Sequence, residues 1–394
     1  MAFHMNKFFN QAMLTLAGVI LLIGIWRTTG TKAEPVDVLF CVYDLGDTLP
    51  LEKVMSKLEK EKVSYKVMAI GKASEKLKSS THLVSIEGFK SEETINWPRE
   101  RLLSDQILKG LKKRYQPKVI IAGMAAAFQA QVLTYFKEQE AYTLAFYDNF
   151  DPVTTKEYVQ PFLQQVGTID TYLIPAQATL KSFQAHEKTK IANLEVVGQP
   201  VLEEWDEIFN TTDRAKLRKK IGLPDTAQVI LFVGGYDSTY QEYFTRFVQG
   251  AKKLEGQKDV KFLVTYHPKT DGSLEKKIVT EQKATNIQII DKDGPSSTQL
   301  ATLAKVLVCH KSGMGMQALY KGLLVMYVVK KDSYPNFALD QGLATQAETA
   351  EEVAETLKRL LAAVNKNRAD VKNLGVPMNA TSEIVAKIKE HLTK

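Results

Sequence analysis

Short apolar segments rich in β-branched residues recur along the chain, separated by longer stretches with helical character. The first, residues 36–42 (VDVLFCV), is almost continuously apolar, as strands buried on both faces of a parallel sheet are. A polar turn, residues 43–47 (YDLGD), and a Lys/Glu-rich helical stretch, residues 51–62, follow it. Further strands are expected at 63–70, 84–86, 118–122, 143–147, 171–174 and 194–197, and helices at 102–115 and 125–137. This alternation predicts an α/β fold with a doubly wound parallel sheet.

The same alternation restarts after a break. The break holds Gly198-Gln199-Pro200, a helical linker over 201–221, and a stop at Gly222-Leu223-Pro224. The later strands are expected at 229–233, 261–266, 287–290, 306–309 and 325–329, and helices at 351–364 and 382–392. We therefore expect two Rossmann-like domains, residues 34–200 and 201–375, facing each other across a cleft, followed by a C-terminal helical segment, residues 376–394.

The first 33 residues form a separate unit. Residues 12–26 (AMLTLAGVILLIGIW) are an uncharged run, shorter than the roughly 20 apolar residues of a typical membrane-spanning helix and typical of a signal-peptide core. Extension to residues 8–26 makes the run long enough to anchor the chain in a thin membrane. Two outcomes stay open, a signal anchor or export after cleavage near Ala33. The flanking positive charges are nearly balanced and do not fix the side of the membrane.

Composition limits the classes of protein and partner. Apolar residues make up 44% and charged residues 25%, as in soluble globular proteins, which excludes a disordered or polytopic membrane chain. The net charge of +7 is spread along the chain without basic blocks, so no nucleic-acid partner is expected. Cys41 and Cys309 lie inside apolar runs and are expected to be buried thiols. The His and Cys spacings match no metal site, so no bound metal is expected.

A segment of small residues, 311–319 (KSGMGMQAL), directly follows the strand that ends at Cys309. Small residues let backbone N–H groups approach an anion, and a helix beginning near Gly315 would add its positive end. Lys311 and Ser312 are the expected partners of a diphosphate.

Two further signals lie at strand ends in the second half. Gly234-Gly235 end the strand 229–233, and His267, followed by Pro268, ends the strand 261–266. A His in this position can donate to a phosphate or a sugar hydroxyl. Ligands of parallel sheets bind at the carboxyl ends of the strands. We therefore predict one ligand site at this edge.

The order and spacing of these signals resemble a known group of enzymes. The segments 222–235 (GLP…VILFVGG), 264–269 (VTYHPK), 306–328 (VLVCHKSGMGMQALYKGLLVMYV) and 342–361 (GLATQAETAEEVAETLKRLL) resemble the C-terminal half of GT-B glycosyltransferases. That group includes the UDP-GlcNAc 2-epimerases and glycerophosphate polymer transferases. The segment 196–201 (VVGQPV) is similar to the interdomain hinge of the group.

The resemblance implies a nucleotide-sugar site in the second domain and a C-terminal helix that crosses back to the first domain. The residues expected around the diphosphate and sugar are Gly234, Gly235, His267, Lys311, Ser312, Gly313 and Gln317. A UDP-linked sugar is the expected donor. The helix dipole, Lys and Ser can carry the diphosphate charge, so neither a metal nor a further cofactor is expected.

The chain also departs from the group. Ala318 and Leu319 stand where the epimerases carry two carboxylates, which argues against 2-epimerase chemistry. The Glu-x7-Glu pattern of retaining members is absent, which favours inversion. An inverting transferase needs a general base at the acceptor hydroxyl. Asp44, Asp47 and Asp148 follow first-domain strands and are candidates, with Asp44 and Asp148 preferred, although each residue type also forms turns and helix caps.

The function expected from these observations is a membrane-tethered or exported glycosyltransferase. It would transfer a sugar from a UDP-sugar to a lipid or an envelope glycan. Two alternatives stay open: a two-lobed solute-binding protein of the periplasmic type, and a GT-B-like protein that binds a nucleotide or a partner without turnover.

Overall fold

The computed structural model describes residues 33–334, 336–363 and 375–393. The expected signal peptide or anchor therefore lies outside the described residues. Within those residues, none of the helices combines the length and the apolar character that a membrane crossing requires.

The first domain is built on a fully parallel sheet of six strands in the order β2-β1-β3-β4-β5-β6. Its strands are β1 (Val38–Val42), β2 (Tyr65–Ala69), β3 (Val119–Gly123), β4 (Tyr142–Phe146), β5 (Thr171–Ile174) and β6 (Asn193–Val196). Every residue of β1 is buried, because helices cover both faces of the sheet. The main helices are α2 (Leu45–Lys60), α3 (Lys72–Leu77), α4 (Asp105–Tyr115), α5 (Ala127–Lys137), α6 (Gln160–Gln165) and α7 (Gln177–Ala185).

Two local predictions in this domain were wrong. Helix α2 begins at Leu45 rather than at residue 51, because the Asp44 carboxylate accepts a hydrogen bond from the Leu45 N–H at 2.9 Å and Asp47 accepts one from the Asp44 N–H at 3.0 Å. This reciprocal capping makes Asp44 the N-cap and places residues 45–47 of the expected polar turn inside the helix. Residues 84–86 form no strand. The chain makes one parallel bridge, Val67 to Leu83, before it turns away at Gly88.

The second domain repeats the design with six parallel strands in the order β12-β11-β10-β7-β8-β9. They are β7 (Gln228–Val233), β8 (Val260–Thr265), β9 (Ile287–Ile289), β10 (Ala304–Cys309), β11 (Leu324–Val328) and the unpredicted β12 (Thr345–Ala347). The helices are α9 (Arg214–Lys220), α10 (Tyr240–Lys252), α11 (Ser273–Glu281), α12 (Ser297–Ala301), α13 (Met314–Tyr320), α14 (Phe337–Asp340) and α15 (Ala350–Ala362). Strand order reverses between β7 and β10, where doubly wound sheets bind ligands.

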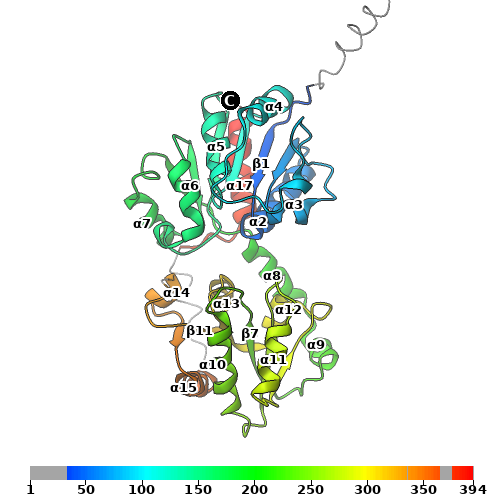
Figure 1. Cartoon of the computed structure of the whole chain (residues 1–394), viewed down its shortest axis with the longest axis vertical. Helices are drawn as coiled ribbons and strands as arrows, with labels where there is room; N and C mark the ends of the chain where they lie inside the picture. The colour runs from blue at the N-terminus through cyan, green and yellow to red at the C-terminus, as the bar shows by residue number, and fades with distance from the viewer. Residues whose placement is uncertain (1–32, 335, 364–374, 394) are drawn as a thin grey trace, which may run out of the picture.

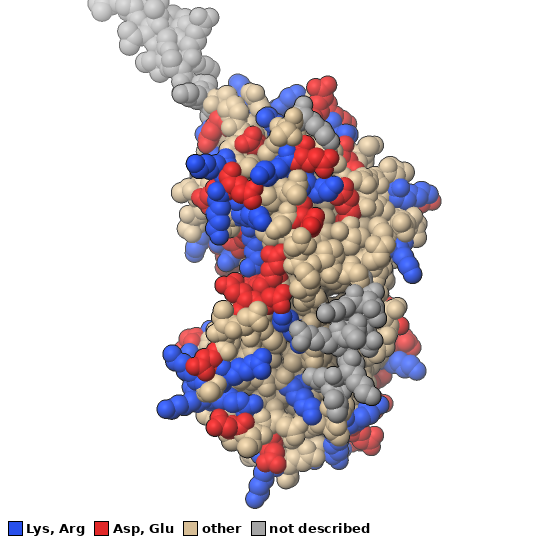
Figure 2. Space-filling view, turned by 180° about the vertical axis from the view of Figure 1, so that it is seen from behind, with Lys and Arg blue, Asp and Glu red and all other residues tan. Residues whose placement is uncertain are grey.

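Helix α8 (Val201–Thr211) joins the two domains, and the final helix α17 (Ala380–Leu392) lies among the helices of the first domain (Figure 1). Ile384, Val385 and Ile388 of α17 belong to the same buried cluster as β1. Glu203 of α8 accepts a hydrogen bond from the Thr381 N–H at 2.8 Å, which ties the start of α17 to the connector. Figure 2 shows acidic side chains gathered at the waist between the domains.

A second connection lies at the far edge of the sheets. Phe150 and Ala176 of the first domain are buried within the apolar cluster of the second domain. Nearby, Asp151 Oδ1 accepts a hydrogen bond from the Phe337 N–H at 2.8 Å. The carboxyl ends of both sheets therefore face each other across a packed boundary.

Candidate functional site

The first-domain side of the site centres on Asp148, which lies two residues after the end of β4 and follows the buried Tyr147. Its Oδ1 accepts a hydrogen bond from the Tyr158 hydroxyl at 2.9 Å. The hinge residue Gln199 donates to the Asp148 backbone carbonyl at 2.6 Å, so the interdomain linker holds this loop. Burial raises the pKa of Asp148 above its usual value, and the negative charge of Asp44 acts in the same direction.

Arg99 lies between Asp44 and Tyr158, the residue that donates to Asp148. Its guanidinium donates to Asp44 Oδ2 at 2.7 Å and to the Ala125 carbonyl at 2.7 Å. It also lies against the rings of Tyr43 and Tyr158, 5.0 and 5.7 Å from their centres. Asp44 thus caps α2 and fixes the position of the Arg99 guanidinium.

Asp47 lies beneath these groups and is 1% exposed. It accepts hydrogen bonds from the Gln129 amide at 2.7 Å and from the Tyr43 N–H at 3.2 Å. Burial, with the nearby Asp148 carboxylate adding to it, raises the pKa of Asp47 to about 7. Because Asp47 is buried and bonded to Gln129 and Tyr43, its carboxyl group has little room to contact a substrate atom.

The second-domain side begins with the two glycines after β7. A Cβ atom on Gly234 would lie 2.9 Å from the His267 backbone nitrogen, and one on Gly235 would lie 2.9 Å from the Tyr240 ring. Glycine is therefore required at both positions, and Gly234 packs directly against the turn that carries His267. Burial, together with the charge of Lys269, lowers the pKa of His267 to about 4. His267 is therefore a neutral ring near pH 7.

A polar cluster connects the loop after β7 to the loop after β10. Asp237 lies 3.3 Å from the Lys311 ammonium and 3.3 Å from His310 Nε2. Thr239 is within 2.9 Å of the same nitrogen, and His310 Nδ1 lies 2.8 Å from the Val328 carbonyl. Burial lowers the pKa of His310, so in its neutral ring Nδ1 carries the proton shared with that carbonyl.

The segment after β10 opens helix α13. Ser312 Oγ accepts a hydrogen bond from the Met314 N–H at 3.3 Å, and Gly313 is the N-cap with open space where a side chain would extend. A Cβ atom on Gly315 would lie 2.0 Å from the Tyr327 hydroxyl, so a tight helix–strand contact requires that glycine. Gln317 lies one turn into the helix and is partly buried.

The structure brings Gly234, Gly235, His267 and Lys311 together at the carboxyl ends of β7, β8 and β10, and places Ser312 and Gly313 at the start of α13. Within residues 33–334, 336–363 and 375–393, no group of three His, Cys, Asp or Glu side chains is arranged to hold a metal ion. Sequence reasoning missed Arg99, Tyr158, Asp237 and His310. Arg99 lies in a turn and Tyr158 in a short 3-10 helix, Glu157–Val159, and neither carries a periodic or motif signal. His310 could have been found as the polar residue that directly follows the apolar run of β10.

Comparison with known proteins rests on three-dimensional structure. No family model and no curated protein matches the sequence. A UDP complex of Staphylococcus aureus MnaA superposes with a TM-score of 0.66 at 12% identity, over 91% of this chain and 97% of that one. The UDP-GlcNAc 2-epimerase of Neisseria meningitidis bound to UDP-GlcNAc gives 0.63 at 12% identity, over 90% and 100%. MurG of Acinetobacter baumannii gives 0.58 at 15% identity, over 90% and 100%.

The chain has the GT-B fold. This confirms the expected fold class, two doubly wound α/β domains, and extends the resemblance from the second half to about 90% of the chain. In this GT-B chain, Asp44, Asp47 and Asp148 lie on the first-domain side of the boundary. The glycines, His267 and Lys311 lie on the opposite side.

Proposed function

We propose that this GT-B chain is an inverting glycosyltransferase that uses a nucleotide-sugar, with Asp148 as the base for the acceptor hydroxyl. Asp148 carries the proposal: it is a carboxylate of raised pKa, oriented through Oδ1 by Tyr158, at the face that meets the donor domain. A base is most efficient when its pKa approaches the working pH, which the raised value favours.

The donor would lie at the carboxyl ends of β7, β8 and β10. Lys311 supplies a positive charge there, and Gly234 and Gly235 keep the backbone accessible. The UDP and UDP-GlcNAc in the solved MnaA and epimerase structures support a nucleoside-diphosphate sugar as the ligand class. A UDP-sugar is therefore the donor we propose.

The transfer step balances without a further reactant. The acceptor hydroxyl oxygen attacks the anomeric carbon while its proton passes to Asp148. The bond between that carbon and the diphosphate oxygen breaks, and the nucleoside diphosphate leaves with the electron pair. Lys311 offsets the charge that develops on the diphosphate. Residues 8–26 would tether the enzyme to a membrane, or lead to its export, which fits an acceptor of the cell envelope.

Thermal unfolding of the full chain with UDP and a panel of UDP-sugars tests the donor site. A ligand at about 100 times its dissociation constant stabilises by about 2.7 kcal/mol. Ser312→Ala should reduce the shift, whereas Ser104→Ala, which removes the N-cap of α4 in the first domain, should not. Absence of any shift would refute the donor assignment.

Turnover is tested by release of UDP from the stabilising UDP-sugar in the presence of candidate acceptors. Asp148→Asn should bind the donor normally and lose about 100-fold or more in rate, within the usual range for loss of a general base. Donor binding without turnover on any acceptor would support the non-catalytic alternative.

A further inference from the structure

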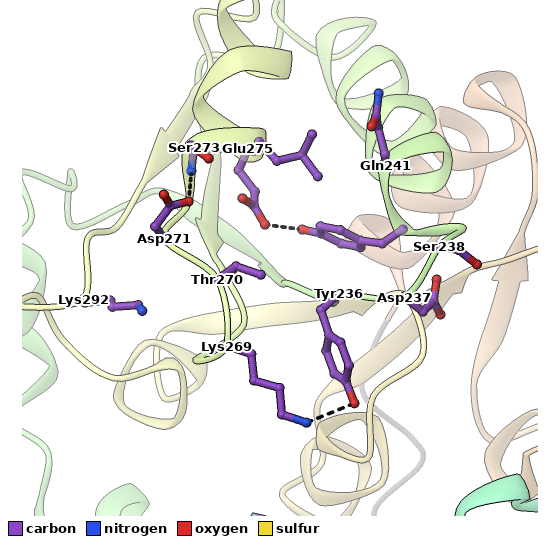
Figure 3. Close-up of a pocket in the computed structure, with 13 residues that line it drawn as sticks. Tyr236, Asp237, Ser238, Gln241, Lys269, Thr270, Asp271, Ser273, Glu275 and Lys292 are labelled. Carbon is purple, nitrogen blue, oxygen red and sulfur yellow. Dashed lines mark hydrogen bonds between the residues drawn. The ribbon is translucent and has the colours of Figure 1, made fainter. Parts of the chain in front are cut away.

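A polar pocket lies beside the proposed donor site, between the N-terminal ends of α10 and α11 (Figure 3). Its volume is about 730 Å³, within the usual range for small-ligand sites. The residues that the argument uses are Tyr236, Tyr240, Lys269, Asp271, Glu275 and Lys292. Of the seven residues expected to hold the donor, only Gly235 is in the lining.

Glu275 shows what kind of group the pocket is built to receive. The residue is 1% exposed, and its Oε1 accepts a hydrogen bond from the Tyr240 hydroxyl at 2.7 Å. Its Oε2 is buried without a hydrogen-bond partner in the described structure. Burying a carboxylate oxygen without a hydrogen-bond partner lowers the stability of the fold. The presence of such an oxygen in a residue that lines a pocket therefore points to a ligand that donates a hydrogen bond.

Tyr236 supplies an apolar surface in another part of the same pocket, where its ring points toward Lys269 (Figure 3). Its side chain is unusually exposed for an aromatic residue, at 56%. Two neighbours nonetheless fix the position of the Tyr236 ring. The centre of the His267 ring lies 4.3 Å from the centre of the Tyr236 ring, and the Lys269 ammonium lies 4.5 Å from the same centre. A fixed, exposed ring is suited to pack against the flat apolar face of another ring.

The charges favour a neutral ligand. The lining carries Lys269, Lys292, Asp271 and Glu275, two charges of each sign, and also Asp237, whose charge is offset by the Lys311 ammonium 3.3 Å away. A polyanion would be repelled by the two acidic side chains, and a polycation would be repelled by the two lysines. Hydroxyl donors, a flat apolar face and no net charge together describe a sugar ring.

We propose that this pocket binds a neutral pyranose unit of the acceptor, so that the acceptor is a glycan. The inference rests on the proposed transferase function. Lys269 joins the two regions, because its ammonium lies 3.4 Å from the Tyr236 hydroxyl and 4.0 Å from Asp44 Oδ1 in the first domain. A glycan whose terminal hydroxyl reaches Asp148 can therefore extend along Asp44 and Lys269 and place a preceding unit against Tyr236 and Glu275.

Saturation-transfer NMR on the full chain tests the pocket with cellobiose, maltose, lactose and N,N′-diacetylchitobiose as probes. At least one disaccharide should receive saturation from the protein. Tyr236→Ala, at an exposed position that leaves the core intact, should weaken its binding about tenfold. Glu275→Gln keeps an acceptor for Tyr240 but loses the charge, and should weaken binding about fivefold, because hydrogen bonds to charged groups are the stronger ones. Glu281→Gln, an exposed site on the same helix, is the matched control and should bind as the wild type does.

Failure of this inference is distinguishable from failure of the proposed function. The UDP-induced thermal shift is measured on the same samples and should persist in Tyr236→Ala and Glu275→Gln. A normal UDP shift, with no saturation of any disaccharide or with binding that neither variant weakens, overturns the glycan pocket alone. Loss of the UDP shift in the wild type overturns the transferase function and, with it, the acceptor assignment.

Discussion

Gly46 lies so close to the Asp148 carboxylate that a Cβ atom on Gly46 would be 2.1 Å from Asp148 Oδ2. The absence of a side chain on Gly46 therefore lets Asp148 Oδ2 pack against the start of α2, while Oδ1 accepts the hydrogen bond from Tyr158. Gly46 lies within α2, where alanine would otherwise favour the helix. A glycine at this position of α2 is therefore required for the observed position of the Asp148 carboxylate.

Gly46→Ala should displace the Asp148 carboxylate and lower the transfer rate about 100-fold, because a shift of about 1 Å in a reacting group has that effect. UDP release measures the rate. Gly110→Ala in α4 is the control, since its Cβ would come no closer than 3.8 Å to Ile86. That control should stabilise the fold by about 0.5–1 kcal/mol in urea unfolding and leave the rate unchanged. Full activity of Gly46→Ala would contradict the role assigned to Asp148.

Lys269→Met should raise the pKa of His267, because the ammonium adds to burial in lowering it to about 4. The value should stay below the ordinary 6.5, since burial is the larger cause and remains. NMR titration of the His267 ring protons measures the shift. Lys292→Met removes another pocket lysine and should leave the titration unchanged.

The same pKa sets a pH dependence of stability. Between about 6.5 and about 4 the unfolded chain binds a proton at His267 that the folded chain excludes, so this group lowers the free energy of unfolding as pH falls. Lys269→Met should lose less stability over this window than the wild type, as measured by urea unfolding at successive pH values.

Asp47 should act in the opposite direction. Its folded pKa of about 7 lies above the ordinary 3.8, so the folded chain holds a proton that the unfolded chain releases, and stability from this group is lost as pH rises through about 7. Asp148→Asn removes a neighbouring charge that raises the pKa of Asp47. It also removes the Asp148 carboxyl, whose own pKa is raised in the folded chain. Its urea stability relative to wild type should therefore improve as pH rises from 5 to 8. The exposed Asp225→Asn should show no such trend.

Asp151 and Lys156 form a buried ion pair next to the hydrogen bond from the Phe337 N–H. Asp151→Asn should cost about 3–5 kcal/mol in urea unfolding, because Lys156 is left buried without its partner. The double variant Asp151→Asn with Lys156→Met should recover part of that loss. Glu93→Gln, which breaks the exposed pair with Lys90, should cost less than about 1 kcal/mol. An equal loss of unfolding free energy in Asp151→Asn and Glu93→Gln would show that the buried pair stabilises the fold no more than the exposed one.

Strand positions followed from sequence wherever burial on both faces made the pattern continuous. The runs 36–42 and 229–233 lie at β1 and β7, because fully buried parallel strands need apolar residues at every position. Residues 84–86 look similar but add no strand to the sheet: the parallel bridge to β2 is made by Leu83, and Ile86 pairs only with Phe89 across a turn. Strand β12 escaped prediction because its three residues, TQA, lie at a sheet edge where burial imposes no pattern.

The chain of residues thus determined by itself the α/β alternation, the break near residue 200 and the strand ends that carry Gly234, His267 and Lys311, because these depend on local periodicity and on turn chemistry. Only the tertiary structure decided which carboxylate is oriented by a tyrosine, which arginine lies against that tyrosine, and that Glu275 keeps a buried oxygen without a partner. Those properties arise from contacts between segments distant in sequence. Hydrogen-bond satisfaction and desolvation are set by the packed surroundings, so no local pattern encodes them.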